Sequence, residues 1–474
     1  MCYFALLFLL CLGTMGFGQS IAPRPNVVLV MADDQGWGDM AYNGHATLQT
    51  PNFDSAAAAG LRFDRFYAAA PVCSPTRASV LTGRHPNRSG VLQWGHPLRP
   101  QEVTLAELMH QAGYATAHFG KWHLGSVRST SPVHPGMHGF QFWVSAPNYF
   151  DQDPILSKMG EAVRYTGESS LVTAAVATNW MRQQVAAEHR FLAVVWLGSP
   201  HAPHQGSSAN LEIYKGNKDR HFLAEMTGMD AAFGTIRAAL DELGVRNDTI
   251  LWYCSDNGAL RRVGSTGGFR GHKGQVYEGG LLVPAILEWP SRVKSHRATS
   301  VRCNTSDILP TLCELAGVSL PNRSYDGVSL VPLIDDRGTR CQPMGFWHFE
   351  THGIPVRAKE LMQELWDAQQ QGRELPPYAA CLTAAELPDS PYSTDHFPGH
   401  AAWTDGDWKL HRIEHDQQVQ WELYHLKRDP FETADCIQKY PDVRMSMQEP
   451  FLDWLESVVR SLNGEDYRER SPTP

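Results

Sequence analysis

The chain has 474 residues, 42% of them hydrophobic and 14 of them tryptophan, a composition typical of a globular protein with a large core. The formal net charge of −9 argues against nucleic-acid binding, although an acidic protein can still contain a locally positive pocket. No CxxC pair occurs among the nine cysteines, so a structural zinc site is not expected.

The first residues have the shape of a signal peptide. An apolar run at 3–12 is too short to cross a bilayer, and small residues follow it, although no Lys or Arg precedes Arg24. Later in the chain no segment is predicted to be transmembrane. We therefore expect residues 1–20 to be removed and the protein to be exported to a periplasm, the medium or a secretory or lysosomal lumen. Seven cysteines then stay, an odd number that points to a reactive or modified thiol.

Continuous apolar runs predict strands that are buried on both faces, as in parallel sheets. Segments with a helical period alternate with them, which predicts an α/β fold with a central, mostly parallel sheet and helices on both sides. The predicted strands are 26–32, 115–119, 191–197 and 249–254, and the predicted helices include 103–111 and 222–243.

The pattern changes to short polar stretches and turns near residues 322–345. Two aromatic-rich stretches, 401–413 and 421–426, lie on either side of a turn and predict an antiparallel hairpin. We therefore expect a large α/β domain over 24–340 and a smaller C-terminal α+β domain with an antiparallel sheet over 341–474. The polar tail after Ser461 is expected to fray.

The stretch CSPTRASVLTGR at 73–84 predicts a helix that follows a lone cysteine. Ser74 is the expected N-cap, Pro75 suits the first helical position, and Gly83 ends the helix. The free N–H groups of a helix N-terminus stabilise an anion, and Arg77, one turn further on, adds a guanidinium group that matches a tetrahedral oxyanion. The helix start is therefore a candidate anion site.

Polar residues follow three of the predicted strands, at the carboxyl ends where ligands bind in open α/β sheets. These residues have two interpretations: they cap helices and form turns, or they form a metal site. The second interpretation is favoured because three such ends face one edge and supply oxygen ligands, which suit Ca²⁺ or Mg²⁺. The oxygen ligands come from Asp33, Asp34, Asp256 and Asn257, and His201 follows the remaining strand end.

Basic residues gather in two short motifs. GKWHLG supplies Lys121 and His123, and FRGHKG supplies Lys273. Each could be an ordinary solvated loop residue, or all could bind an anion together with Arg77. An unmodified Cys73 thiolate would be a soft ligand among hard oxygen ligands. An oxygen-bearing modification of this cysteine would remove that mismatch.

In this order, the motifs resemble the sulfatase family, the formylglycine-dependent branch of the alkaline-phosphatase-like superfamily. The C-x-P-x-R element is the most specific of them, and the resemblance extends over most of the chain. It is carried by NVVLVMADDQGWGD (26–39), CSPTRASVLTGR (73–84), GKWHLG (120–125), SPHAPH (199–204), CSDNG (254–258), RGHKGQVYEGG (270–280), DGDWKL (405–410) and ELYHLKRDPFET (422–433).

The resemblance implies that a formylglycine-generating or equivalent maturase oxidises Cys73 to formylglycine (3-oxoalanine), whose hydrate is a geminal diol. One hydroxyl group would bind a single Ca²⁺ ion and the other would attack sulfur. The other implied ligands of the ion are Asp33, Asp34, Asp256 and Asn257.

The resemblance also assigns catalytic roles. Arg77 would hold the diol in place, and Lys121, His201 and Lys273 would bind the sulfate oxygens. His201 would protonate the leaving alcohol, and His123 would take a proton from the diol so that sulfate is released.

The resemblance implies a sulfated carbohydrate as substrate, such as a glycosaminoglycan or another sulfated polysaccharide fragment. Its pocket is expected in loops 126–165 and 346–400, whose aromatic residues either stack on sugar rings or pack in the core. An aryl sulfate, phosphonate or phosphate ester hydrolase on the same fold is the first alternative. A non-catalytic binder of sulfated glycans is the second, if Cys73 is not converted. The aromatic residues are Trp143, Tyr149, Trp347 and Trp366.

Overall fold

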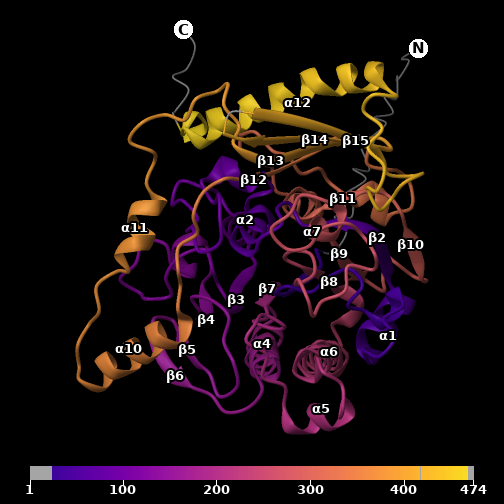
Figure 1. Cartoon of the computed structure of the whole chain (residues 1–474). Coiled ribbons are helices and arrows are strands. Elements are labelled where there is room, and N and C mark those ends of the chain that lie inside the picture. Colours follow the sequence, from indigo (N-terminus) through magenta and orange to yellow (C-terminus); the bar gives the residue numbers. More distant parts are fainter. Residues whose placement is uncertain (1–23, 417, 468–474) are drawn as a thin grey trace, which may run out of the picture.

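The computed structural model describes residues 24–416 and 418–467, so the expected signal peptide lies outside the described residues. The described chain forms two sheets, a large mixed sheet and a smaller antiparallel one, with helices packed against both (Figure 1). Among the described residues, no helix combines the length and the apolar character that a membrane crossing requires.

The large sheet has 11 strands in the order β10-β2-β9-β8-β1-β7-β3-β4-β5-β6, and β11 pairs with β2. Its central strands, from β8 to β4, are all parallel. The mostly parallel α/β sheet predicted from the sequence is therefore confirmed. The strands are β1 (Asn26–Ala32), β2 (Leu61–Tyr67), β3 (Ala115–Lys121), β4 (Phe142–Ala146), β5 (Ile155–Lys158), β6 (Glu161–Arg164), β7 (Phe191–Trp196), β8 (Thr249–Ser255), β9 (Leu282–Glu288), β10 (Arg297–Thr299) and β11 (Cys303–Asn304).

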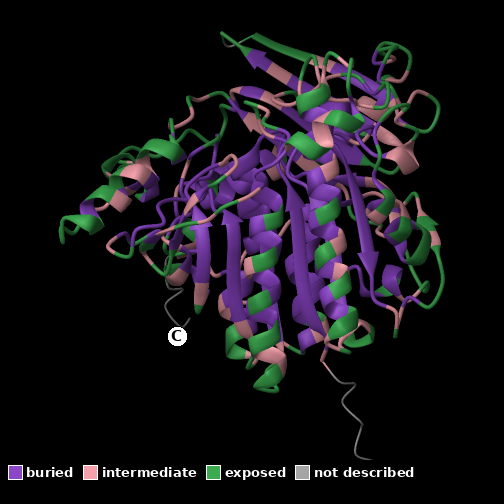
Figure 2. Cartoon of the chain, turned by 90° about the horizontal axis from the view of Figure 1, so that it is seen from below, coloured by how far each residue is buried: buried purple, intermediate pink, exposed green. Residues whose placement is uncertain are grey.

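Both faces of this sheet are buried, which explains why its strands are apolar without alternation. Along β1, Val27 and Leu29 belong to one hydrophobic core, whereas Val28 and Val30 belong to the other. Figure 2 shows the buried strands behind helices whose exposed side faces outward. A continuous apolar run is the pattern that burial on both faces requires.

The helices divide between the two faces of the sheet. Helices α1, α4 and α6 cover one face, and α2, α3 and α8 cover the other. The helices are α1 (Pro51–Ala59), α2 (Cys73–Thr82), α3 (Leu105–Gln111), α4 (Ser169–Ala186), α5 (Ser208–Ile213), α6 (Arg220–Glu242), α7 (Glu278–Leu281), α8 (Ile308–Ala316), α9 (Val331–Ile334), α10 (Ala358–Gln370), α11 (Ala379–Ala385) and α12 (Pro441–Leu462).

Helix α2 corrects one prediction. Its first residue is Cys73, and its N-cap is Val72, whose extended backbone leads into the first turn without a side-chain cap. Ser74 is therefore not the N-cap; its Oγ instead accepts a hydrogen bond from the Gly95 amide at 2.8 Å. Pro75 lies in the first turn but not at its first position. Gly83 ends the helix in the left-handed conformation, as predicted.

The small sheet is antiparallel, with strands in the order β12-β13-β14-β15. The stretch 401–413, predicted as one arm of a hairpin, contains two strands that reverse at Gly406 (φ 53°), where Asp405 pairs with Trp408. The antiparallel pairing is confirmed, but the hairpin is part of a longer meander. The strands are β12 (Met344–Phe349), β13 (Gly399–Asp405), β14 (Trp408–His415) and β15 (Gln418–His425).

The C-terminal part of the chain is held more firmly than its polar sequence suggested. Helix α12 packs on the small sheet through Phe451 and Leu455, and a short 3-10 helix follows at Glu465–Tyr467. There the Tyr467 hydroxyl donates to Glu102 at 2.5 Å. The predicted fraying is therefore wrong up to residue 467, and the residues after it lie outside the described range. The domain boundary near residue 340 stays a prediction.

Candidate active site

The register of the central strands brings the predicted site residues together. Ala32 at the end of β1 is aligned with Ser255 at the end of β8, and β7 lies on the other side of β1. The Asp33 amide donates to the carbonyl oxygen of Ser199 at 3.0 Å, and the Asp256 amide donates to that of Ala32 at 3.2 Å. Three polar strand ends therefore meet at one edge of the sheet, as the sequence predicted.

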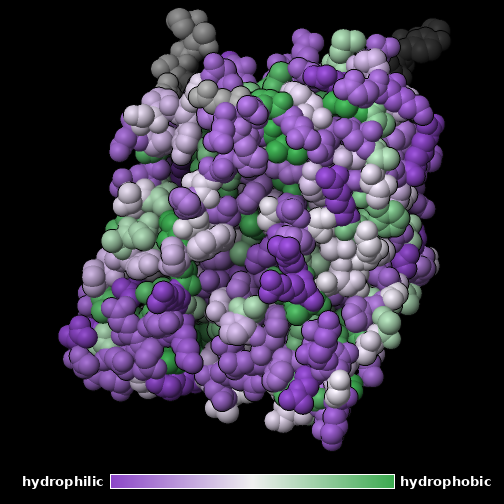
Figure 3. Space-filling view, in the orientation of Figure 1, coloured by the Kyte–Doolittle hydropathy of each residue, from purple (hydrophilic) through white to green (hydrophobic). Residues whose placement is uncertain are grey.

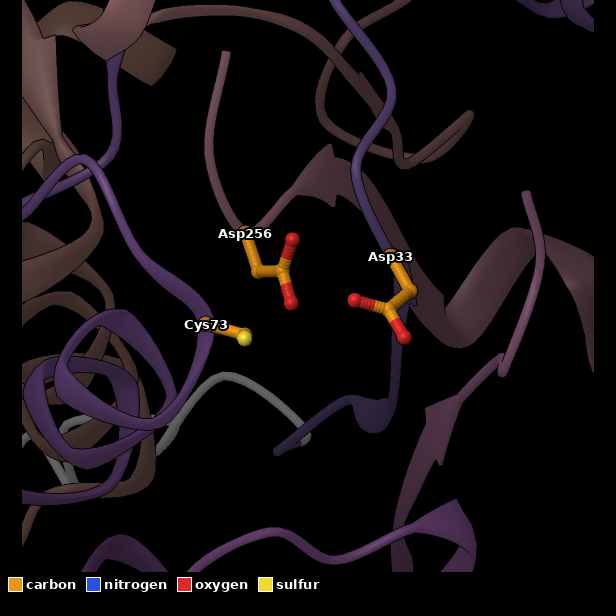
Figure 4. Close-up of side chains that lie close together, drawn as sticks. All are labelled: Asp33, Cys73 and Asp256. Carbon is orange, nitrogen blue, oxygen red and sulfur yellow. The ribbon is translucent and has the colours of Figure 1, made fainter. Parts of the chain in front are cut away.

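The N-terminus of α2 meets the same edge. Figure 4 shows the side chains of Cys73, Asp33 and Asp256 pointing toward one another from three separate segments. One ligand atom from each of these three buried residues lies within 4.8 Å of the others, and the same holds for Asp33, Asp34 and His201. Residues far apart in sequence thus surround one buried point.

Three carboxylates alternate with three cations around this point, and we call these six residues the edge cluster. The Lys121 ammonium donates to Asp33 at 2.7 Å, and the Lys273 ammonium donates to Asp34 at 2.7 Å. The Arg77 guanidinium donates to Asp256 at 2.6 Å. The ends of β1, β3 and β8, helix α2 and the loop that carries Lys273 are thereby joined. The edge cluster consists of Asp33, Asp34, Arg77, Lys121, Asp256 and Lys273.

Arg77 is fully buried, as Lys121 is. Its guanidinium also donates to the carbonyl oxygen of Lys121 at 3.2 Å and lies over the ring of Trp196, 5.1 Å from the ring centroid. The sequence analysis assigned no site role to Trp196, because a tryptophan in a buried strand is normally a core residue. The stacked ring and the Asp256 carboxylate fix the guanidinium group beside Cys73.

Two oxygen atoms at this point are buried without a hydrogen-bond partner among the described residues, namely Oδ1 of Asp33 and Oδ1 of Asn257. The Asn257 amide group donates to Asp34 at 2.9 Å, which leaves its oxygen free to accept. An unsatisfied buried oxygen is costly, and a hard cation would satisfy both atoms. The residues present therefore fit a divalent cation with oxygen ligands.

The acidic and thiol groups of the site have perturbed pKa values. Burial alone would raise the pKa of Asp34, but the nearby Lys273, His201 and Lys121 outweigh it and hold that pKa well below its usual range. Burial raises the pKa of Asp256 to about 6 although Arg77 opposes the shift. Burial also raises the pKa of the Cys73 thiol, so the unmodified side chain is a neutral thiol near pH 7.

Both histidines of the site are neutral near pH 7. Burial, with Lys121 and Arg77 next in importance, lowers the pKa of His123 well below its usual value. Both of its ring nitrogens are buried without a hydrogen-bond partner among the described residues. Burial lowers the pKa of His201 to about 3, although Asp34 opposes the shift. A neutral imidazole has a free nitrogen that can accept a proton, although the lowered pKa makes His123 a weaker base than a solvent-exposed histidine.

The structure gathers every residue that the sequence assigned to the catalytic or metal site, while their individual roles stay predictions. The aromatic residues expected to line a sugar pocket separate into two groups. Trp143 and Trp347 are buried, only 5% and 1% exposed, and are core residues. Tyr149 stacks on His201 with the ring centroids 4.2 Å apart, and Trp366 lies beneath Arg164.

One residue that holds the site was missed. Glu225 of α6 accepts hydrogen bonds from the Gln205 amide and from the His204 ring, the latter at 3.3 Å, and so anchors the loop that carries His201. The feature of the sequence that could have identified Glu225 is its position, because it is an acidic residue next to Met226 on the apolar face of a predicted helix. A buried acid in such a pattern requires a partner, but the sequence does not identify that partner.

Comparison with known proteins agrees with this geometry. The profile of the Sulfatase family matches residues 25–318. Rat arylsulfatase G is 35% identical over 376 residues, which cover 67% of this chain and 70% of the relative. Dog N-acetylgalactosamine-6-sulfatase is 32% identical over 388 residues, 72% of each chain. The chain belongs to the sulfatase family and is a sulfuric ester hydrolase.

Solved structures share the fold over nearly the whole chain. The complex of Ps i-CgsB with k-i-k-neocarrahexaose has a TM-score of 0.77 at 22% identity, covering 94% of this chain and 96% of that one. The phosphonate monoester hydrolase of Agrobacterium radiobacter has a TM-score of 0.61 at 20% identity, covering 92% and 96%. At these identities the likeness supports the alkaline-phosphatase-like fold and does not distinguish between ester classes.

Proposed function

We propose that this chain hydrolyses sulfate monoesters of sulfated carbohydrates, with a nucleophile formed from Cys73 and a bound Ca²⁺ ion. The observation that carries the proposal is the convergence of Cys73, Asp33 and Asp256 at one buried point beside unsatisfied oxygen atoms. The carbohydrate part is supported by relatives, one an N-acetylgalactosamine-6-sulfatase and another solved with a neocarrahexaose.

The proposed cation ligands are Asp33, Asp34, Asp256 and Asn257, together with the group formed from Cys73. All of these supply oxygen, which favours Ca²⁺. Bound there, the ion would act as a Lewis acid and offset the charge of the carboxylates. The three cations of the edge cluster would then be free to face an anionic substrate.

Cys73 is proposed to be converted to formylglycine, which supplies a hydrated aldehyde with a hydroxyl nucleophile. In this conversion the Cβ–S bond breaks, the sulfur leaves as sulfide and a carbonyl oxygen takes its place. This is a two-electron oxidation at Cβ, so a maturase that brings an oxidant is an implied partner. The raised pKa of the Cys73 thiol supports this proposal, because a neutral thiol is a poor nucleophile and a poor cation ligand.

The remaining residues act on the ester itself. Lys121 and Lys273 bind sulfate oxygens and stabilise the charge that develops on them. An anionic ester beside His201 raises the pKa of its imidazole, so that it can protonate the leaving alcohol. His123, neutral and unpartnered among the described residues, accepts a proton during sulfate release. Arg77, fixed by Asp256, orients the group formed from Cys73.

We also propose that residues 1–20 act as a signal peptide and that the protein is exported. The N-terminal residue of the protein purified from its own host tests this. A mature chain that begins after residue 20 supports export, and a chain that still carries the leader contradicts it.

The proposed function is tested by sulfate release from sulfated oligosaccharides, an aryl sulfate and a phosphonate monoester. We expect sulfate release from the saccharides, lost in Cys73→Ala and Lys121→Ala. Turnover of the aryl sulfate or the phosphonate, without sulfate release from any saccharide, would overturn the carbohydrate assignment. Binding of sulfated saccharides without turnover, together with an unmodified Cys73, would instead identify a non-catalytic binder.

A further inference from the structure

A long excursion of the chain separates two neighbouring strands of the small sheet. Phe349 of β12 pairs with Gly399 of β13, yet residues 350–398 lie between them, where a turn of two to five residues suffices in a hairpin. This excursion carries α10 away from the small sheet to the β5 and β6 edge of the large sheet, and α11 lies on the way back (Figure 1). Such an extension requires a reason other than joining the two strands.

Helix α10 is fixed against the edge of the large sheet. The Gln369 side chain exchanges hydrogen bonds with the backbone of Ala162 in β6, at 2.8 and 3.2 Å. Arg128 donates to Glu364 of α10 at 2.6 Å. The Asn148 side chain, in the loop after β4, donates to the carbonyl oxygen of Val356 at 2.9 Å. The start of the helix is therefore held over the large sheet.

A cleft of about 580 Å³ lies under the start of α10. Its walls are the loop after β4, the residues that follow His201, and residues 356–363. The volume is within the range of small-molecule sites, which run from roughly 300 to 1,000 Å³. The excursion between β12 and β13 thus forms one wall of a site-sized cleft.

This cleft begins where the candidate sulfate site ends. Tyr149 lines the cleft, and its ring stacks on that of His201 at an angle of 15°. Pro203 and Gln205, on the same loop as His201, line it as well, and Gln152 donates to the carbonyl oxygen of Gln205 at 2.7 Å. A substrate whose sulfate lies beside His201 would extend into this space.

The lining of the cleft is polar and mixed in charge. Asp151, Asp153 and Glu360 oppose three cations, and Tyr149 and Phe150 contribute aromatic rings. The face that carries α10 is hydrophilic over most of its area, with apolar residues in small groups (Figure 3). Hydrogen-bonding groups beside an aromatic ring suit sugar rings better than an apolar ligand. The three cations are Arg164, Arg357 and Lys359.

Two of these cations are free to bind a ligand. Arg357 and Lys359 are exposed and form no ion pair with another described residue. Arg164, in contrast, donates to Gln363 at 3.2 Å and lies over the ring of Trp366. A sulfate or carboxylate group on a neighbouring sugar would find two unpaired cations at the start of α10.

We propose that this cleft binds the sugar residues next to the sulfated one, and that Arg357 and Lys359 bind an acidic substituent of that neighbour. The substrate class is then an acidic oligosaccharide and not a single sulfated sugar. This inference rests on the proposed function. It assigns Arg357, Lys359 and Gln363 as specificity residues that leave the chemistry at Cys73 untouched.

The test compares kcat/KM for sulfate release from two probes. One is a chondroitin sulfate or carrageenan oligosaccharide that the wild type desulfates, and the other is a simple aryl sulfate. The double variant Arg357→Ala/Lys359→Ala is expected to lose at least about tenfold on the oligosaccharide, with aryl sulfate turnover within about twofold of wild type. Gln363→Ala is expected to act in the same direction. Gln370→Ala, exposed on the same helix but outside the cleft, is the matched control and is expected to change neither value.

The outcomes separate the two claims. Equal losses on both probes, or no loss on the oligosaccharide, would overturn the cleft as a subsite while sulfatase activity stands. Turnover of the aryl sulfate with no saccharide cleaved by the wild type would overturn the carbohydrate assignment and the cleft together. Turnover of neither probe by protein with a converted Cys73 would overturn the proposed function itself. Because all three side chains lie at the surface of the cleft, near-UV circular dichroism is expected to confirm that the variants fold.

Discussion

Two of the buried ion clusters among the described residues differ in how completely their polar atoms are satisfied. In the edge cluster, three carboxylates face three cations, yet Oδ1 of Asp33 and the nearby Oδ1 of Asn257 have no hydrogen-bond partner among the described residues. The second cluster lies where the small sheet meets the large one. We call it the interface cluster; it consists of Tyr67, Glu278, Lys409, His411 and Glu432.

Every charged group of the interface cluster is paired. The Lys409 ammonium lies 2.9 Å from Glu278 and 3.0 Å from Glu432. Glu278 also accepts the Tyr67 hydroxyl at 2.8 Å, and Glu432 lies 2.8 Å from the His411 ring and accepts the Glu278 amide at 2.6 Å. A closed network of this kind joins two sheets and leaves nothing for a ligand to bind.

The difference is informative about function. Both clusters are buried except for Lys273, whose side chain is 21% exposed, and both mix acids with cations. Burial and charge alone therefore do not distinguish a site from a structural network. Unsatisfied oxygen atoms distinguish the two clusters, because a buried acceptor without a hydrogen-bond partner destabilises the fold unless a ligand supplies that partner. The unsatisfied oxygens therefore favour the edge cluster as the candidate ligand site, and the interface cluster joins Glu278, just after the loop that carries Lys273, to Lys409 of the small sheet.

The largest expected effect separates activity from stability at the edge cluster. Cys73→Ala is expected to reduce sulfate release by about 10⁵-fold or more, the loss typical of removing a nucleophile, and to change the free energy of unfolding by only about 1 kcal/mol. Cys381→Ala, at another buried free cysteine, is the matched control and should retain activity. Residual activity in Cys73→Ala above about 1% of wild type would contradict the assignment of the nucleophile.

The interface cluster should show the opposite behaviour. Lys409→Met leaves Glu278 and Glu432 buried without their cation, so we expect the free energy of unfolding to fall by about 3–5 kcal/mol in denaturant titrations. Lys294→Met, at an exposed lysine, should be neutral. A loss below about 1 kcal/mol would show that the closed network is not what holds the two sheets together.

Added calcium should distinguish the clusters directly. At a Ca²⁺ concentration of 100 times its Kd, the free energy of unfolding should rise by about 2.7 kcal/mol, seen as a higher Tm that a chelator reverses. Asp33→Asn should abolish this rise, whereas Glu432→Gln, which alters the other cluster, should preserve it. An equal response in both variants would mean that calcium does not bind at the edge cluster.

A pH-dependent effect is expected from Asp39, a buried acid outside both clusters. Its carboxylate accepts the amides of Gly36 and Ser265 at 2.9 and 2.8 Å, and burial raises its pKa from 3.8 to about 7. The folded protein thus holds this proton more tightly than the unfolded chain does, so its contribution to stability is fully present below pH 3.8 and lost as the pH rises to about 7.

We therefore expect the free energy of unfolding of the wild type to fall relative to that of Asp39→Asn between pH 4 and pH 7, by at most about 1.4 kcal/mol per pH unit. Unfolding measured at several pH values gives both slopes. Asp389→Asn, at an exposed acid, should follow the wild type. Parallel slopes for Asp39→Asn and wild type would exclude a raised pKa at this position.

The sequence predicted those features that depend on local pattern. The strand at 26–32 was correct because burial on both faces leaves an unbroken apolar run, and the polar residues that end β1 and β8 were placed correctly because parallel strands end at one edge. The Ser74 cap was wrong because cap preferences cannot anticipate that the Gly95 amide takes this hydroxyl as its acceptor. The turn at Gly406 was missed although Asp-Gly favours a tight hairpin.

The interface cluster and the cleft could not be predicted from the sequence. Lys409 meets Glu278 across 131 positions, and Tyr149 meets His201 across three strands and helix α4, so no spacing along the chain reveals either pair. The path of residues 350–398 is likewise determined by the surface on which α10 packs. The hydrophobic pattern of these residues does not reveal that surface. Motifs therefore identified the reactive centre, whereas the surfaces around it required three-dimensional contacts.

The central claim is that Cys73 provides the reactive group of the site, and the mass of one peptide tests it most directly. Trypsin releases residues 66–77, FYAAAPVCSPTR, from the protein purified from its own host. A peptide in which the thiol is replaced by an aldehyde oxygen, and which reacts with a hydrazine probe, is the result this account predicts. A peptide that carries only the unmodified thiol, from protein that releases sulfate, would contradict it.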